Sequence, residues 1–126
     1  MAGMYQSGPL SKPVPYSTTA VKTGQKWIDG KDIYMKTFEI TDWSNLPTNR
    51  RKSYNIGETI TNFIKAEGRF ATSSAYTQLF TTDLTNHVPW AVQLTDVFPT
   101  YFDLYFGSSI TPNLLNVEVT LYFTID

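Results

Sequence analysis

The side chains with the clearest chemical potential are one histidine and several carboxylates. His87 is the only histidine in the chain, so no multi-histidine metal site can form. A hydrolase of the Ser-His-Asp type would need His87 beside an activated hydroxyl, and the sequence contains no nucleophile-elbow motif. We interpret His87, two residues before Pro89, as a surface loop residue.

Carboxylates could in principle supply the acid–base pair of a glycosidase, which needs two carboxyl groups roughly 5–10 Å apart, one with a raised pKa. The sequence gives no reason to pair any two of them, because Asp29 is explained by a turn and the others lie in polar contexts. The absence of cysteine excludes thiolate zinc sites and a cysteine nucleophile. We therefore expect no catalytic residue, no metal and no cofactor. The carboxylates considered are Asp29, Asp32, Glu39, Asp42, Glu58 and Glu67.

Aromatic residues make up 15% of the chain, and two tryptophans lie in predicted loops. Trp43 stands among turn-forming polar residues, and Trp90 follows a proline. An exposed indole beside amides and carboxylates can stack on a sugar ring while its neighbours bind the hydroxyl groups. The alternative for each tryptophan is an anchor that folds the loop onto the core. Asp103 shares a strand face with two tyrosines, so the predicted ligand-binding residues are Trp43, Trp90 and Asp103.

The charge pattern narrows the partner classes. The net charge is −1, and a nucleic-acid-binding protein would normally carry a clear basic excess. The only dense basic run, residues 50–52, is interpreted as a solvated strand face, with contact to an anionic polymer such as teichoic acid as a weaker alternative. No window approaches the ~20 apolar residues of a membrane-spanning helix, so we expect no membrane insertion.

Composition and periodicity favour β-structure. Charged residues make up 17% of the chain, and aromatic and β-branched residues are abundant, as is typical of strands. Residues 20–28 and 31–40 flank Asp29-Gly30, which predicts a hairpin with a two-residue type I′ turn. Residues 117–125 alternate between apolar and mostly polar positions, the pattern of a half-buried strand. Residues 58–70 fit a helix and a strand about equally well by periodicity.

Further short strands are predicted at residues 50–55, 75–82, 88–95 and 101–106. Short strands separated by turn signals suggest an all-β antiparallel sandwich, jelly-roll-like, with about eight strands. Three prolines between residues 5 and 19 favour an extended run over a helix. We expect an extended, proline-rich arm over residues 1–19 and one sandwich domain over residues 20–126.

Three stretches together resemble a module of bacteriophage and prophage tail proteins. The first is Tyr16-Ser17-Thr18-Thr19 followed by Thr23-Gly24-x-x-Trp27-Ile28-Asp29-Gly30-Lys31-x-Ile33-Tyr34-x-Lys36-Thr37. The second is the segment 60–70 with Ala66-Glu67-Gly68, and the third is the closing strand 116–124. The resemblance covers residues 16–126 and favours a strand over residues 58–70.

The resemblance implies a β-sandwich receptor-binding head of a tail fibre or baseplate protein. It implies a virion location, homotrimer formation, contact with other tail proteins, and non-catalytic recognition of a host-surface saccharide. No saccharide contact carries over, because the matching residues lie in scaffold strands. Two other functions stay open: a purely structural virion component, such as a spacer or capsid decoration, and a glycan hydrolase.

Overall fold

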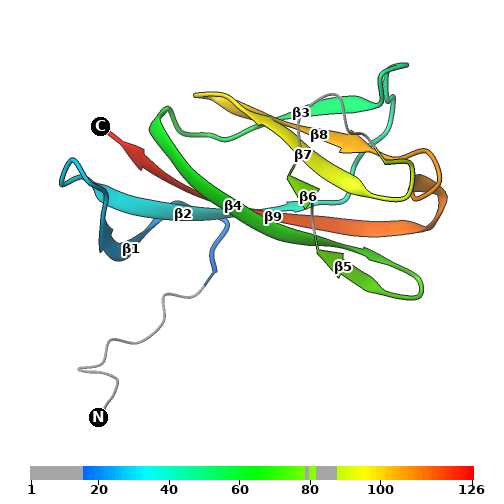
Figure 1. The fold of residues 1–126 in the computed structure, drawn as a ribbon, viewed down its shortest axis with the longest axis horizontal. Helices are drawn as coiled ribbons and strands as arrows, with labels where there is room; N and C mark the ends of the chain where they lie inside the picture. Colours follow the sequence, from blue (N-terminus) through cyan, green and yellow to red (C-terminus); the bar gives the residue numbers. More distant parts are fainter. Residues whose placement is uncertain (1–15, 79, 82–87) are drawn as a thin grey trace, which may run out of the picture.

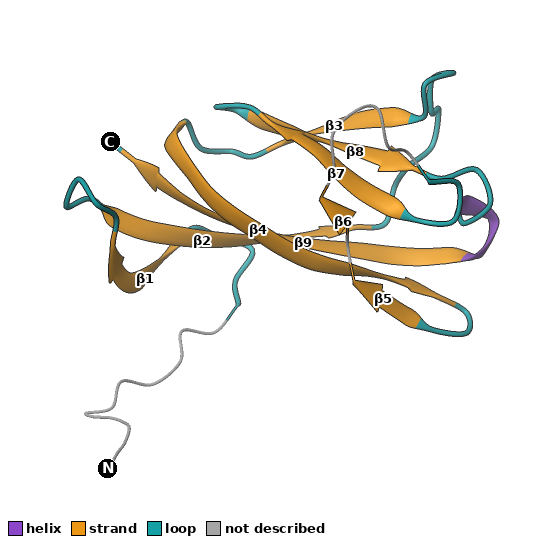
Figure 2. Ribbon diagram, in the orientation of Figure 1, coloured by secondary structure: helices purple, strands orange, loops and turns teal. Residues whose placement is uncertain are grey.

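The computed structural model describes residues 16–78, 80–81 and 88–126, with positions 80 and 81 described in their backbone only. These residues form nine strands and one short 3-10 helix (Figure 2). Residues 1–15 of the arm predicted over residues 1–19, and His87, lie outside the described residues. The elements are β1 (Val21–Lys26), β2 (Asp32–Ile40), β3 (Arg51–Asn55), β4 (Ile60–Thr72), β5 (Tyr76–Gln78), β6 (Phe80–Thr81), β7 (Val92–Val97), β8 (Tyr101–Phe106), η1 (Thr111–Asn113) and β9 (Leu114–Ile125).

The strands form two sheets that pack face to face (Figure 1). One sheet has the order β1-β2-β9-β4-β5, and the other has the order β3-β8-β7-β6. Neighbouring strands are antiparallel, except for the two-residue pairing of β6 with β7. The prediction of an all-β antiparallel sandwich is therefore confirmed, and the short strands at 50–55 and 101–106 are confirmed with it.

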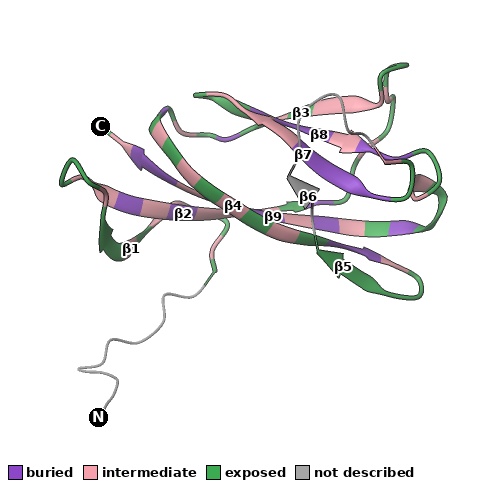
Figure 3. Ribbon diagram, in the orientation of Figure 1, coloured by how far each residue is buried: buried purple, intermediate pink, exposed green. Residues whose placement is uncertain are grey.

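Strand β9 lies at the centre of the larger sheet, between β2 and β4. Its inward row, Val117, Val119, Leu121 and Phe123, has no exposed surface, which confirms the alternation predicted for this strand (Figure 3). Each such side chain contributes roughly 1.5–3 kcal/mol when it leaves water. The alternation therefore decides which face of the larger sheet meets the smaller one.

The smaller sheet supplies the opposite half of the core through Phe102, Leu104 and Phe106 of β8, all fully buried. The Phe38 ring on β2 contacts the Phe102 ring edge-on at a centroid distance of 5.0 Å. Edge-to-face pairs add about 0.5–1.5 kcal/mol to the burial of the rings themselves. This contact joins the two sheets across the core.

The turn between β1 and β2 corrects a prediction. The Trp27 N–H donates to the Lys31 carbonyl, and the Gly30 N–H donates to the Trp27 carbonyl, each at 2.9 Å. Only Gly30, at φ 86°, has a positive φ in this turn. The loop therefore has three residues, like a type I turn followed by a G1 bulge, and the type I′ prediction is wrong. Asp29 keeps a negative φ while its carboxylate accepts the Lys31 N–H at 3.0 Å.

The segment whose periodicity fitted a helix and a strand about equally well is a strand, β4. Residues 60–72 form a strand that pairs with β9 along its length, as the family resemblance favoured. Gly68 lies so close to β9 that a Cβ atom there would stand 2.1 Å from the Glu118 carbonyl oxygen. A glycine at this position therefore lets the backbones of β4 and β9 approach each other closely.

Candidate functional site

The two predicted tryptophans lie in different environments. Trp43 is half-buried between β2 and β3, and its ring packs on Phe106 at a centroid distance of 5.9 Å. The same loop is held by the Tyr54 hydroxyl, which donates to the Asp42 carbonyl at 2.8 Å. Trp43 thus anchors its loop on the core, which is the alternative role given for it from the sequence. Trp90 precedes β7 and is 59% exposed, so its side chain is accessible to a partner.

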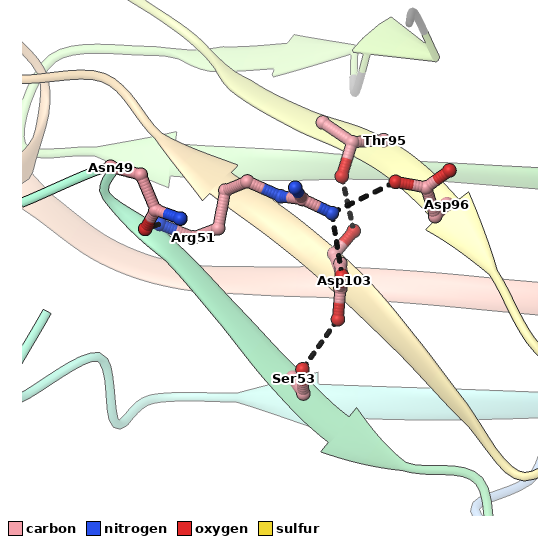
Figure 4. Close-up of polar contacts among 6 residues, drawn as sticks. All are labelled: Asn49, Arg51, Ser53, Thr95, Asp96 and Asp103. Carbon is pink, nitrogen blue, oxygen red and sulfur yellow. Dashed lines mark hydrogen bonds and ion pairs between the residues drawn. The ribbon is translucent and has the colours of Figure 1, made fainter. Parts of the chain in front are cut away.

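Asp103 lies on the outer face of the smaller sheet within a polar cluster (Figure 4). The Arg51 Nη2 atom is 2.7 Å from Asp103 Oδ2 and 2.9 Å from Asp96 Oδ2. The Ser53 hydroxyl donates to the second Asp103 oxygen. Asp103 is only 8% exposed, and its carboxylate is occupied by bonds within the chain. Among the described residues, the buried Arg51 Nε has no hydrogen-bond partner.

The basic run at residues 50–52 is bound into the fold. The Arg50 guanidinium donates to the Phe106 carbonyl at 2.7 Å and to the Thr111 hydroxyl at 2.8 Å. The Lys52 ammonium donates to the Ser44 carbonyl at 2.9 Å. With Arg51 in its ion pairs, each of the three side chains has partners within the chain. The run is therefore bonded within the chain and keeps part of its surface exposed.

The outer face of the larger sheet carries a surface pocket of about 510 Å³. None of the three predicted site residues lines it. Its lining side chains come from β2, β9, β4 and β5, and from the segment that precedes β1, which Figure 1 shows on the side of this sheet away from the smaller one. The lining residues are Tyr16, Thr37, Glu39, Glu67, Gly68, Arg69, Gln78, Glu118 and Thr120.

One end of the pocket is built around the Glu67 carboxylate. Its Oε1 atom accepts a hydrogen bond from the Tyr122 hydroxyl at 2.6 Å and another from the Tyr16 hydroxyl at 3.1 Å. Burial, and then the bond to Glu67, raises the pKa of the Tyr122 hydroxyl above its ordinary value. Tyr122 therefore remains a neutral donor at physiological pH and holds Glu67 in one orientation.

A row of charged and amide side chains crosses the pocket floor. Glu39 lies opposite Glu118, Glu118 lies opposite Arg69, and Arg69 lies opposite Gln78 on successive strands. The Arg69 Nε donates to Glu118 Oε1 at 2.9 Å. Neither the Glu39 carboxylate nor the Gln78 amide has a hydrogen-bond or ion-pair partner among the described residues. Within the described part of the chain, these two groups therefore keep hydrogen-bonding capacity that a ligand could use.

The neighbouring row of side chains on the pocket floor has uncharged threonines on β2 and β9. The Thr37 and Thr120 hydroxyls lie 2.8 Å apart and share a hydrogen bond, and Glu67 continues this row on β4. The pocket thus combines carboxylate acceptors, hydroxyl groups, a guanidinium donor and an amide. Such a set can form hydrogen bonds with a polyhydroxylated molecule in several directions.

Sequence reasoning did not find this pocket. Glu39 and Glu67 were considered there as candidates for a carboxylate pair and set aside, and Arg69, Gln78 and Glu118 were not considered as site residues. Their outward positions follow from the period-2 alternation of each strand. Their assembly into one pocket follows from the strand order β2-β9-β4-β5, which no short-range pattern encodes.

The described residues contain no group of three or more His, Cys, Asp or Glu side chains placed to hold a metal ion. No helix within residues 16–78, 80–81 and 88–126 is long and apolar enough to cross a membrane. Comparison of the chain with protein-family models, curated proteins and solved structures gives no match. The resemblance to phage tail modules therefore stays a prediction from the motifs.

Proposed function

We propose that this protein is a non-catalytic module that binds a saccharide in the pocket on the outer face of the larger sheet. The observation that carries the proposal is the set of oriented polar groups in that pocket, with Glu39 and Gln78 unpartnered among the described residues. Sugar hydroxyls both donate and accept hydrogen bonds, so they match a site that offers carboxylates, an amide and a guanidinium. The exposed Tyr16 adds an aromatic face against which a sugar ring can pack.

The charges of the pocket favour an uncharged saccharide. Three carboxylates, Glu39, Glu67 and Glu118, face one cation, Arg69. The local excess of negative charge opposes an anionic polymer such as teichoic acid, because like charges at short range raise its free energy of binding. Of the basic run 50–52, which lies outside this pocket, Arg51 already pairs with two carboxylates of the chain.

The biological setting of this proposal rests on the family resemblance. We place the module in a phage tail fibre or baseplate, where copies of it, as a homotrimer beside other tail proteins, adsorb to a host-surface polysaccharide. A receptor-binding role requires the pocket to remain open to the host after assembly. The pocket lies on the outer face of a sheet, which is compatible with that requirement.

A structural virion component is the second candidate. The observation that favours it is a set of exposed apolar side chains, Ile28 at 90%, Trp90 at 59% and Leu115 at 57%. These side chains lie in separate segments, the β1–β2 turn, the residues before β7 and the start of β9, so each would anchor a contact with another protein on its own. This candidate predicts no saccharide binding, so a single binding experiment separates the two functions.

The test is a glycan array of bacterial envelope saccharides, followed by titration calorimetry with the bound glycans. We expect saturable binding that weakens about tenfold or more in Glu39→Ala and Gln78→Ala, because each change removes a polar contact. Gln25→Ala, on the exposed β1 strand, is the matched control and is expected to bind like the wild type.

Three results would contradict the proposal. Absence of binding to every glycan favours the structural candidate. Loss of binding in Trp90→Ala, with the two pocket variants unaffected, moves the site to the exposed tryptophan predicted from the sequence. Release of a sugar product during incubation with a bound polysaccharide contradicts the non-catalytic role.

A further inference from the structure

We infer that the pocket binds a saccharide chain that runs across the strands, and that its ligand is longer than a single sugar ring. The inference rests on the proposed function and specifies the ligand of that same site. It is carried by the register of the sheet, by the segment that forms one wall of the pocket, and by an exposed aromatic ring at one end of the polar row.

The polar floor of the pocket runs across the strands. Glu39, Glu118, Arg69 and Gln78 belong to four successive strands and stand opposite one another in register. Four strands span three spacings of ~4.8 Å, so the row extends for about 14 Å at right angles to the strands. The two groups without partners among the described residues, on Glu39 and Gln78, stand at its opposite ends. A ligand that satisfies both must reach from β2 to β5.

Tyr16 forms one wall of the pocket. The Ser17 carbonyl accepts the Thr37 N–H at 2.8 Å, which fixes this segment beside β2. The Tyr16 hydroxyl reaches Glu67 on β4. The Tyr16 side chain therefore crosses the outer face over β9, in the same direction as the polar row. Together they border a trough that runs across the strands.

A second exposed tyrosine, Tyr76, lies on β5, two residues along the strand from Gln78. Tyr76 is 73% exposed, and the Arg69 guanidinium lies over its ring at 4.9 Å. This cation–π contact holds an aromatic face next to the end of the row that carries Gln78. A sugar ring beyond the pocket can pack on Tyr76, while another ring of the same chain packs on Tyr16.

The volume agrees with a ligand of this size. Pockets of about 300–1,000 Å³ enclose drug-sized ligands, and the pocket here measures about 510 Å³. A chain in the trough thus fills the pocket and extends onto Tyr76. The ligand class that follows is an uncharged oligosaccharide or an internal stretch of a polysaccharide.

The experiment titrates the protein with oligosaccharides of glucose, galactose, rhamnose and N-acetylglucosamine, each from one to six residues long. For the sugars that bind, we expect the affinity to rise with length and to be about tenfold higher for the longer chains than for the monosaccharide. Tyr76→Ala is expected to remove most of this gain, so that the affinity of the variant changes little from the monosaccharide to the longest chain. Gln25→Ala serves again as the control.

The outcomes separate the inference from the function on which it rests. Equal affinity for the monosaccharide and the longest chain overturns the extended-chain inference and leaves saccharide binding in place. A gain with length that persists in Tyr76→Ala overturns the direction assigned to the chain. No binding to any member of the four series, with none on the envelope array, overturns both the inference and the proposed function.

Discussion

The outer faces of the two sheets use charged residues in opposite ways. On the smaller sheet, Arg51 bridges Asp96 and Asp103, and Ser53 completes the bonding of the Asp103 carboxylate. The Asp103 side chain keeps only 11% of its surface exposed. Its oxygens are therefore occupied by bonds within the chain and have little contact with water.

On the larger sheet, charges lie in rows with incomplete pairing. Glu118 is paired with Arg69, whereas Glu39 directly opposite has no partner among the described residues. Two like charges on directly opposite residues destabilise a sheet, so folding stability alone does not account for this arrangement. The comparison teaches that a charged residue in a strand serves stability where its bonds are satisfied within the chain, and is available for binding where they are not.

The largest expected effect comes from Arg51→Met. Removal of the guanidinium leaves Asp96 and Asp103 opposite each other without a cation, and we expect the free energy of unfolding to fall by roughly 3 kcal/mol. Urea unfolding followed by tryptophan fluorescence measures the loss. Saccharide affinity of the remaining folded protein should not change, because the cluster lies on the other sheet.

Arg69→Met is the matched variant for that experiment. It removes the same functional group from the larger sheet, but its ion pair with Glu118 is more exposed, at 52% and 35% for the two side chains. If Arg69→Met lost as much stability as Arg51→Met, the distinction between the two faces would be wrong.

A smaller loss of stability is expected for Gly68→Ala. The new methyl group would meet the Glu118 carbonyl oxygen of β9, and overpacking of this kind costs about 1–3 kcal/mol. Because β4 and β9 both line the pocket, saccharide affinity should fall together with stability. Thermal unfolding and calorimetric titration measure the two effects.

Gly107→Ala is the control for this variant. A Cβ atom at Gly107 would stand 2.3 Å from the Pro89 carbonyl oxygen, so a similar loss of stability is expected. Gly107 does not line the pocket, and affinity should be kept. An equal loss of affinity in both variants would show that the effect of Gly68→Ala is not specific to the pocket.

Arg69→Met is expected to weaken saccharide binding while it changes stability little. The substitution removes the cationic donor of the pocket and the contact that holds Tyr76. We expect saccharide affinity to fall about tenfold, equivalent to ~1.4 kcal/mol, with a stability change below about 1 kcal/mol. Titration calorimetry and urea unfolding of the same preparation measure both quantities. Unchanged affinity would remove Arg69 from the proposed site.

The sequence predicted the scaffold better than the site. The alternation of Val117, Val119, Leu121 and Phe123 predicted the core face of β9, because a strand has a fixed period of two. The pocket could not be predicted in this way, since Glu39, Arg69 and Gln78 meet only through pairings between strands far apart in the chain. Trp43, chosen for its residue type, packs on the core.

Two further differences have local physical causes. The Asp29-Gly30 pair predicted the position of the first hairpin but not its loop length, because a three-residue loop also places glycine in the left-handed region. Arg51 was interpreted as a solvated residue of β3, an edge strand, and its ion pairs to β7 and β8 appear only once the strand order is known.

The smallest effect is expected at Asp42, an exposed carboxylate that accepts hydrogen bonds from within the chain. The experiment tests whether these bonds contribute to stability at low pH. Bonds from the Ser44 N–H and then from the Ser44 hydroxyl lower the pKa of Asp42 below its ordinary value of 3.8. A lowered folded-state pKa gives stability that is present above the unfolded-state pKa and is lost as pH falls through the folded-state value. Asp42→Asn removes this titration, so stability should decline less steeply below about pH 4 than in the wild type.

Ser44→Ala keeps the backbone N–H, which is the larger cause of the lowered Asp42 pKa, and should retain most of the wild-type slope. Urea midpoints measured from about pH 7 to about pH 3 make the comparison, and identical slopes in Asp42→Asn and the wild type would show that this exposed carboxylate contributes nothing measurable to acid stability.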